Sequence, residues 1–160
     1  FDSGLTYTIV QPTAYMQNLL AYLPAIREEG VLAVPYPAET CLSLVDLQDV
    51  ATVAAKLLTE SGHRYATSEQ AGTEPLSQTA VADTFSHVLQ RPVEVRSVPL
   101  KTWKAQARAN GSDEDSLKMS ASMFAYYAQS GLAGNPQVLH FLLGHQPTSL
   151  TAFIERITNR

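Results

Sequence analysis

The sequence lacks the short motifs that hold nucleotide phosphates. Its eight glycines form neither Gly-x-Gly-x-x-Gly nor Gly-x-x-x-x-Gly-Lys-Ser/Thr, so no loop of this chain holds a pyrophosphate by the usual route. No tyrosine is followed four residues later by lysine, a common pair for protonating a carbonyl, and no Gly-x-Ser-x-Gly turn is present. These absences remove several kinds of catalytic site from the chain taken alone.

Cysteine, positive charge and long apolar runs are also scarce. Cys41 is the single cysteine, so it forms no internal disulfide, and a cytoplasmic location is expected. The 11 lysines and arginines are scattered and the net charge is -4, which argues against direct contact with nucleic acid. No apolar run approaches the roughly 20 residues that span a bilayer, so no membrane contact is expected.

The titratable residues form no evident metal or catalytic cluster. None of the four histidines has metal-ligand spacing, and His140 and His145 lie five apart across an expected helix end. Asp46 and Asp49 are explained by a helix N-cap and by the positive end of that helix, rather than by paired catalytic carboxylates. Cys41 lies in an expected strand and is interpreted as a small core residue. We therefore predict no metal site and assign no catalytic residue.

The 160 residues are 45% hydrophobic and 16% charged, which is typical of one globular unit. Apolar periodicity and turn residues predict strands or extended segments at 5–10, 31–38, 41–45, 63–68 and 93–96. The same signals predict helices at 15–26, 47–59, 78–90, around 103–107, 113–130, 136–143 and 149–157. Interleaved strands and helices indicate an α/β protein with a mostly parallel sheet, followed by a largely helical tail.

Small polar residues before the apolar stripes predict where the helices begin. Asp46, Ser77, Ser112 and Asn135 are the expected N-caps. A proline inside the expected helix 15–26 should end or kink that helix near its last turn. Glycines at the far ends of three helices predict their C-terminal caps.

The helix over 113–130 is apolar around much of its circumference, and two readings of it stay open. Core packing explains most of such a pattern. Alternatively, Met123, Tyr126 and Tyr127 line a small-molecule cleft, because concave apolar sites with a few hydroxyl groups are typical of ligand pockets. We predict a substrate site formed by these residues together with Met16.

Three segments resemble, in order, segments of the NmrA-like family of atypical short-chain dehydrogenases, which bind NAD(P). The first is Leu5–Leu20, LTYTIVQPTAYMQNLL, in which a strand and a polar residue are followed by Pro, a small residue, an aromatic residue and Asn. The second is Leu44–Ala51, LVDLQDVA, and the third is Leu143–Phe153, LGHQPTSLTAF. The resemblance covers the C-terminal half of the family's domain.

The resemblance implies a Rossmann-like parallel sheet protein whose glycine-rich N-terminal half is absent from these 160 residues. Residues 1–70 would then be the part close to the sheet, and residues 71–160 a mainly helical substrate lobe. NADP or NAD is the implied cofactor of the full-length protein. We expect neither to bind tightly to this chain alone, because the pyrophosphate site lies in the other half.

By the same resemblance, Pro12, Thr13, Tyr15 and Asn18 would lie beside the nicotinamide ring, at the carboxyl end of a strand. Gln11 differs from the basic residue often found at its position in the family. The local alternatives stay equally open: Pro12 as a strand terminator, and Asn18 as the donor of a local hydrogen bond.

Three functions follow as hypotheses. The first is an NAD(P)H-dependent oxidoreductase acting on a small molecule, with this chain supplying the substrate lobe and one wall of the nicotinamide site. The second is a redox-sensing regulator of the NmrA type that binds the dinucleotide without turnover and signals to a protein partner. The third is a free-standing interaction module.

The first residues suggest that the chain is a piece of a larger protein. Residues 1–4 form neither a signal peptide nor a transit segment, no initiator Met is present, and a strong strand follows at once. That strand should expose backbone N–H and C=O groups along one edge. We therefore expect the isolated chain to self-associate as a homo-oligomer, or to be ordered only together with the rest of the protein.

Overall fold

The computed structural model describes residues 4–159 as a mixed α/β fold. The strands are β1 Ile9–Pro12, β2 Ala14–Tyr15, β3 Val31–Val34, β4 Cys41–Leu42, β5 Leu44–Val45, β6 Thr67–Gln70, β7 Leu76–Ser77 and β8 Glu94–Ser97. The helices are the 3-10 helix η1 Met16–Ala21 and the α-helices α1 Leu23–Glu29, α2 Leu47–Thr59, α3 Gln78–Leu89, α4 Leu100–Ala109, α5 Glu114–Ser130, α6 Pro136–Leu143 and α7 Leu150–Thr158.

The described strands form four two-stranded ladders, of which three are parallel. β1 pairs with β6, β2 with β5 and β3 with β8, all in parallel, whereas β4 pairs antiparallel with β7. Only Thr13 separates β1 from β2, so the chain changes its neighbour at that residue: Thr13 N–H donates to Gln70 O at 3.0 Å and Ala14 N–H to Ser43 O at 3.2 Å. The predicted α/β class with parallel strands is confirmed.

Most of the predicted helices are present, and the side chain that caps each one bonds to a backbone group only two or three residues away. The carboxylate of Asp46 accepts a hydrogen bond from Gln48 N–H, and α2 has the predicted bounds 47–59. Ser77, Asn135 and Ser149 cap α3, α6 and α7 in the same way. Each cap satisfies a backbone donor that the first helical turn leaves unpaired.

Two of the predicted helices differ in detail from the structure. The N-cap of α5 is Asp113, whose carboxylate accepts from Ser116 N–H, rather than Ser112. The predicted helix 15–26 is instead η1 followed by α1, with Pro24 in the first turn of α1. Proline is tolerated there because the N–H that it lacks would have no partner within the helix.

Two strands lie later in the chain than predicted. The strand predicted at 5–10 forms its ladder at Ile9–Pro12. Ile9 N–H donates to Ala66 O and Thr13 N–H to Gln70 O. Because successive backbone nitrogens of a strand point to opposite edges, the nitrogen of Pro12 points away from β6, and the ladder needs no donor from it. The strand predicted at 63–68 forms at Thr67–Gln70, because Tyr65 has a φ of 60° and interrupts the extended backbone.

The expected strand 41–45 is divided, and its first residue does not join the core. Before Ser43, the residues Cys41 and Leu42 pair with β7. After Ser43, the residues Leu44 and Val45 pair with β2. Cys41 was interpreted as a core residue, but its side chain is exposed. β4 has one exposed and one buried residue, and a pattern of two residues cannot tell which side chain faces the core.

Two apolar clusters hold the described residues together. The larger one joins η1, α1, β3, α3 and α7 through fully buried side chains such as Met16, Ile26, Leu32, Phe85 and Phe153. The smaller one packs α2 against α6 and consists of Val45, Val53, Leu139 and Leu143. β3 pairs with β8, and the larger cluster contains residues from both sides of position 70. The predicted division into a sheet part and a substrate lobe at that position stays a prediction.

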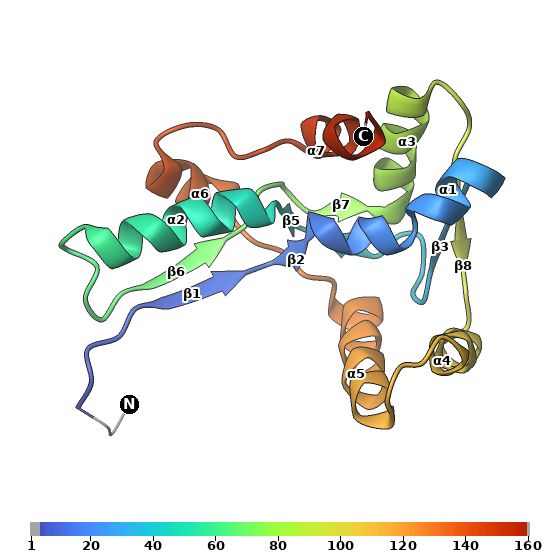
Figure 1. Cartoon of the computed structure of the whole chain (residues 1–160), viewed down its shortest axis with the longest axis horizontal. Helices are drawn as coiled ribbons and strands as arrows, with labels where there is room; N and C mark the ends of the chain where they lie inside the picture. Colours follow the sequence, from blue (N-terminus) through green and yellow to red (C-terminus); the bar gives the residue numbers. More distant parts are fainter. Residues whose placement is uncertain (1–3, 160) are drawn as a thin grey trace.

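The elements are spread over an elongated molecule (Figure 1). The β1–β6 pair lies with α2 and α6 at one end, α4 and α5 lie together at another, and α7 lies against α3. Among residues 4–159, β6 is the only strand that pairs with β1. The open edge predicted for residues 5–10 and the self-association expected from it stay predictions.

Two buried glutamines provide a matched test of polar burial. Gln70 is fully buried, and neither its Oε1 nor its Nε2 has a partner among the described residues. Gln78 is almost as buried, but its Nε2 donates to Thr40 O at 3.0 Å. An amide buried without partners costs on the order of 1–3 kcal/mol relative to one that is hydrogen-bonded.

We therefore expect Gln70→Leu to raise the free energy of unfolding by about 1 kcal/mol and Gln78→Leu to lower it by about 1–2 kcal/mol. Chemical denaturation of both variants measures the difference. A loss of stability in Gln70→Leu as large as that in Gln78→Leu would show that the amide of Gln70 is satisfied.

Candidate functional site

A cavity of about 660 Å³ lies where η1, α4 and α5 meet, and is called the aromatic cavity here. Its aromatic lining residues are Tyr15, Tyr22, Tyr36, Trp103, Phe124 and Tyr127. Its polar lining residues are Gln17, Asn18, Gln78, Gln106, Asn110 and Ser120. The volume lies within the range of small-molecule sites, and the mixture of rings with a few amides is typical of them.

The aromatic side chains pack against one another and fix the walls of the cavity. The rings of Trp103 and Phe124 meet edge to face, with centroids 4.9 Å apart. Tyr36 contacts Phe124 and Tyr127, with centroids 5.8 Å and 6.2 Å away. Edge-to-face and tilted pairs of this kind are the geometries that the ring quadrupoles favour. Through them α4 and α5 are held to the loop that follows β3.

Burial keeps the cavity's phenols protonated. Desolvation raises the pKa of Tyr36 well above its ordinary value, and the nearby phenols of Tyr22 and Tyr127 add to this. Desolvation also raises the pKa of Tyr22 and of Tyr127. These groups therefore stay neutral across the physiological range of pH, where a phenol is a hydrogen-bond donor.

The side chain of Gln17 fixes η1 relative to the start of α2. Its Nε2 donates to Asp46 Oδ1 at 2.7 Å, and its Oε1 accepts from Leu47 N–H at 3.2 Å. The same amide thus serves as a second cap of α2. Because η1 also carries Asn18, this pair of bonds sets the position of one wall of the aromatic cavity.

Asp46 connects that wall to the last helix. Its carboxylate has no exposed surface and accepts a hydrogen bond from Arg156 Nη2 at 2.5 Å. Arg156 Nη1 also donates to Gln48 Oε1 at 2.7 Å. Burial alone would raise the pKa of Asp46, but the hydrogen bonds from Arg156, Gln48 N–H and Gln17, together with the charge of Arg156, lower it overall.

Asp49 does more than complement the end of α2. Its Oδ2 accepts from Thr148 N–H at 2.7 Å, and its Oδ1 accepts from the Thr148 hydroxyl at 3.1 Å. The carboxylate therefore holds the turn before α7 against α2. Together with the Asp46–Arg156 pair, this contact holds the start and the second half of α7 against the first turn of α2.

Four of the eight residues predicted from the sequence line the aromatic cavity. They are Tyr15 and Asn18, from the predicted cofactor set, and Met123 and Tyr127, from the predicted substrate set. The two sets come from segments about a hundred residues apart, and the fold brings members of both to one cavity. Their proposed contacts with ligands stay predictions.

The other four predicted residues lie outside the lining of the aromatic cavity. Met16 is fully buried in the larger core cluster, and Tyr126 is 56% exposed on α5 with its ring against Tyr127. Pro12 is half-buried at the end of β1. Thr13 is buried, and its hydroxyl donates to Gln70 O at 3.3 Å.

Sequence reasoning missed Phe124, which lies beside the predicted Met123 on α5, and three further aromatic residues of the cavity. Tyr22 follows η1, Tyr36 lies in a loop between two prolines, and Trp103 lies on α4. The single tryptophan, in a short helix of low hydrophobicity, was a signal that could have been weighed. The other two gave no local signal, because their role depends on how α5 packs against β3 and η1.

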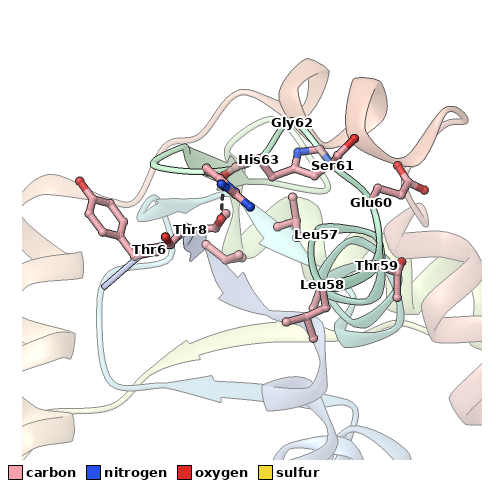
Figure 2. Close-up of a pocket in the computed structure, with 13 residues that line it drawn as sticks. Thr6, Thr8, Leu57, Leu58, Thr59, Glu60, Ser61, Gly62 and His63 are labelled. Carbon is pink, nitrogen blue, oxygen red and sulfur yellow. Dashed lines mark hydrogen bonds between the residues drawn. The ribbon is translucent and has the colours of Figure 1, made fainter. Parts of the chain in front are cut away.

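A second hollow, called the edge groove here, has a volume of about 720 Å³ and lies beside β1 (Figure 2). Leu57 and Leu58 of α2 lie on one side and Thr6 and Thr8 on the other, and the Thr8 hydroxyl donates to His63 O at 2.7 Å. Leu58 is 87% exposed. An exposed apolar helix face of this kind is typical of a packing surface, so the aromatic cavity is the better candidate for a ligand site.

Residues 4–159 contain neither a candidate membrane-spanning helix nor a cluster of metal-ligating side chains. Within that range no helix has the length and apolar character needed to cross a membrane. Nor do three or more His, Cys, Asp or Glu side chains gather there in a geometry that could hold a metal ion. The aromatic cavity is thus the feature of the described chain with the clearest chemistry.

Comparison with known proteins gives consistent matches along the chain. The profile of the NmrA-like family matches residues 2–150. The NAD(P)H azoreductase of Xenophilus azovorans is 35% identical over 133 residues, covering 83% of this chain and 46% of that protein. Quinone oxidoreductase 2 of Escherichia coli is 25% identical over 158 residues, covering 99% of this chain and 55% of that protein.

A solved structure agrees with the sequence matches. The NADPH complex of an NADPH-dependent quinone oxidoreductase from Escherichia coli superposes with a TM-score of 0.86 at 25% identity, covering 99% of this chain and 56% of that chain. The chain therefore spans about half the length of these curated relatives.

The ion pair of Asp46 makes a testable contribution to stability. Asp46→Asn keeps an N-cap acceptor but removes the charge that faces Arg156, which is itself 29% exposed. We expect the variant to lose about 2 kcal/mol of unfolding free energy at neutral pH, somewhat less than for a fully buried pair. Because the folded-state pKa is lowered, the wild type's advantage is complete above about pH 4 and decreases as the pH falls through the folded-state pKa.

Chemical denaturation from acid to neutral pH measures this advantage. Asp113→Asn, at the exposed N-cap of α5, is the matched control and should show a smaller loss. An advantage of the same size at low and neutral pH would contradict the role assigned to the charge.

Proposed function

Because the chain belongs to the NmrA-like family, we propose that it supplies the substrate site and one wall of the nicotinamide site of an NAD(P)H-dependent oxidoreductase. Its similarity to an NAD(P)H azoreductase and to a quinone oxidoreductase supports a small aromatic acceptor as the substrate. The whole protein would also contain a part that binds the phosphates of the cofactor.

The observation that carries the proposal is the meeting of two separate segments at the aromatic cavity. Tyr15 and Asn18 line it from the segment that follows β1, and Met123 and Tyr127 line it from α5. A reductase must hold its acceptor directly against the nicotinamide ring. A cavity lined on one side by the carboxyl end of a parallel strand and on the other by an aromatic helix fits that requirement.

The residues present fit the nicotinamide end of the cofactor and not its phosphates. Asn18 is exposed on η1, and its side chain has no hydrogen-bond partner among the described residues, so its amide is available to a carboxamide group. No glycine-rich turn exists in the sequence to hold a pyrophosphate. We therefore propose that this chain acts as the C-terminal half of a longer protein.

The cofactor, when bound, supplies the hydride. The chain's own residues would bind and orient the acceptor, with Trp103 and Phe124 offering ring surfaces and the phenols of Tyr36 and Tyr127 offering hydrogen-bond donors. Burial of these rings limits the access of water to the acceptor. We assign no proton-donating residue, and the proton that completes the reduction would come from solvent or from the rest of the protein.

A redox-sensing regulator is the second candidate. The observation that favours it is the lining of the aromatic cavity, which among the described residues includes no Asp, Glu, His, Lys or Arg to supply a proton. A site without a ready acid binds a dinucleotide more easily than it turns one over. The exposed edge of β1 and the edge groove would then be available to a protein partner.

The proposal is tested in two arms, one on the chain alone and one on the complete protein. The chain alone should bind NADPH with a dissociation constant above about 1 µM in calorimetry, since the phosphate site is elsewhere. In the complete protein, Asn18→Ala should lower kcat/KM for NADPH-dependent quinone reduction by about tenfold, because an amide contact of this kind contributes about 1 kcal/mol or slightly more.

The control in the complete protein is Gln129→Ala, an exposed residue of α5 outside the aromatic cavity. Its kcat/KM should equal that of the wild type. Submicromolar binding of NADPH to the chain alone, or an unchanged rate in Asn18→Ala with a lower melting temperature, would contradict the proposal. Tight NADPH binding without turnover in the complete protein would favour the regulator.

A further inference from the structure

The lining of the aromatic cavity contains no charged side chain among the described residues. At the chain's average of 16% charged residues, its 21 lining residues would include about three. The edge groove, which is of similar size, includes Glu60, His63 and Arg64. The absence of charge is therefore a property of this cavity and not of the whole surface.

Amides and phenols provide the cavity's polar side-chain groups, together with the hydroxyl of Ser120 and the indole N–H of Trp103. Gln17 and Gln78 are engaged with Asp46 and with Thr40 O, which fixes their orientation. Gln106 and Asn110 lie on the exposed rim at the end of α4. Such groups satisfy the carbonyl, nitrogen or hydroxyl atoms of a neutral ligand, but they cannot neutralise an ion.

The phenols do not acquire charge in the physiological range. Burial raises the pKa of Tyr36, Tyr22 and Tyr127, so all three remain neutral. A charged group on a bound ring would therefore lose its water without gaining an opposite charge. Removing an ion from water without a partner costs far more than removing a hydrogen-bonded neutral group.

We propose that the aromatic cavity selects uncharged planar aromatic ligands and rejects aromatic ligands that carry a charge on the ring system. The selection rests on the proposed function in taking this cavity as the substrate site. Ring stacking against Trp103 and Phe124 supplies affinity that does not depend on charge. Discrimination comes from the cost of burying an unpaired ion. This cost weakens binding of the charged ligand and adds no attraction to the neutral one.

Face contacts with aromatic rings do not reverse this preference for a cation. A cation over a ring gains less than it costs to desolvate the ion without a carboxylate nearby. Cations and anions should therefore both bind more weakly than the neutral ligand of the same shape.

Trp103 is the chain's single tryptophan and lines the cavity, so its fluorescence reports on ligands bound there. The probes are 9-fluorenone, 9-fluorenone-2-carboxylate and a 2-trimethylammonium derivative of 9-fluorenone, which share one ring system and differ in charge. Titrations of the 160-residue chain, repeated by calorimetry, give the three dissociation constants. We expect neutral fluorenone to bind at least about fivefold more tightly than either ion.

A matched pair of variants locates the effect. Gln106→Lys places a cation at the rim of the cavity and should tighten binding of the carboxylate probe by at least about fivefold. Gln129→Lys adds the same charge to α5 outside the cavity and should leave all three affinities unchanged. Both positions are exposed on helices, where lysine is well tolerated.

Each outcome decides something. If neutral fluorenone does not bind at least about fivefold more tightly than both ionic probes, the charge selection is overturned, but the cavity remains the proposed substrate site. An effect of Gln129→Lys equal to that of Gln106→Lys also overturns it, because binding would then respond to overall charge. Failure of all three probes to bind contradicts the proposed function itself, and the inference with it.

Discussion

The buried carboxylate of Asp46 is the contact on which the geometry of the candidate site depends. It accepts hydrogen bonds from the start of α2, from Gln17 on η1 and from Arg156 on α7. These three segments are far apart in the sequence and would otherwise meet only through apolar packing, which fixes distance but not orientation. A single desolvated charge with three directional donors fixes η1, and with it one wall of the aromatic cavity.

The opposite wall is held by rings rather than by charges. α4 and α5 lie away from the β1–β6 pair (Figure 1) and are fixed to the loop after β3 through Tyr36, Phe124 and Tyr127. The candidate site thus combines a polar wall, whose orientation is set by hydrogen bonds, with an aromatic wall that is set by ring contacts.

The elements that sequence predicts well are those specified locally. The caps formed by Asp46 and Asn135 involve backbone groups two residues away, so spacing alone reveals them. Cys41 was placed wrongly because a two-residue ladder carries no usable alternation. Tyr36 and Trp103 were missed because they meet only through α5, and tertiary contacts of this kind leave no periodic signal in either segment.

We propose that ligands occupy the aromatic cavity and not the edge groove. Hydrogen–deuterium exchange of the chain with and without 9-fluorenone distinguishes the two places, because bound ligand slows the opening of the backbone that it contacts. We expect slower exchange in η1 and α5, with no change over residues 57–64. Slower exchange confined to residues 57–64 and β1 would contradict it and assign the ligand to the edge groove.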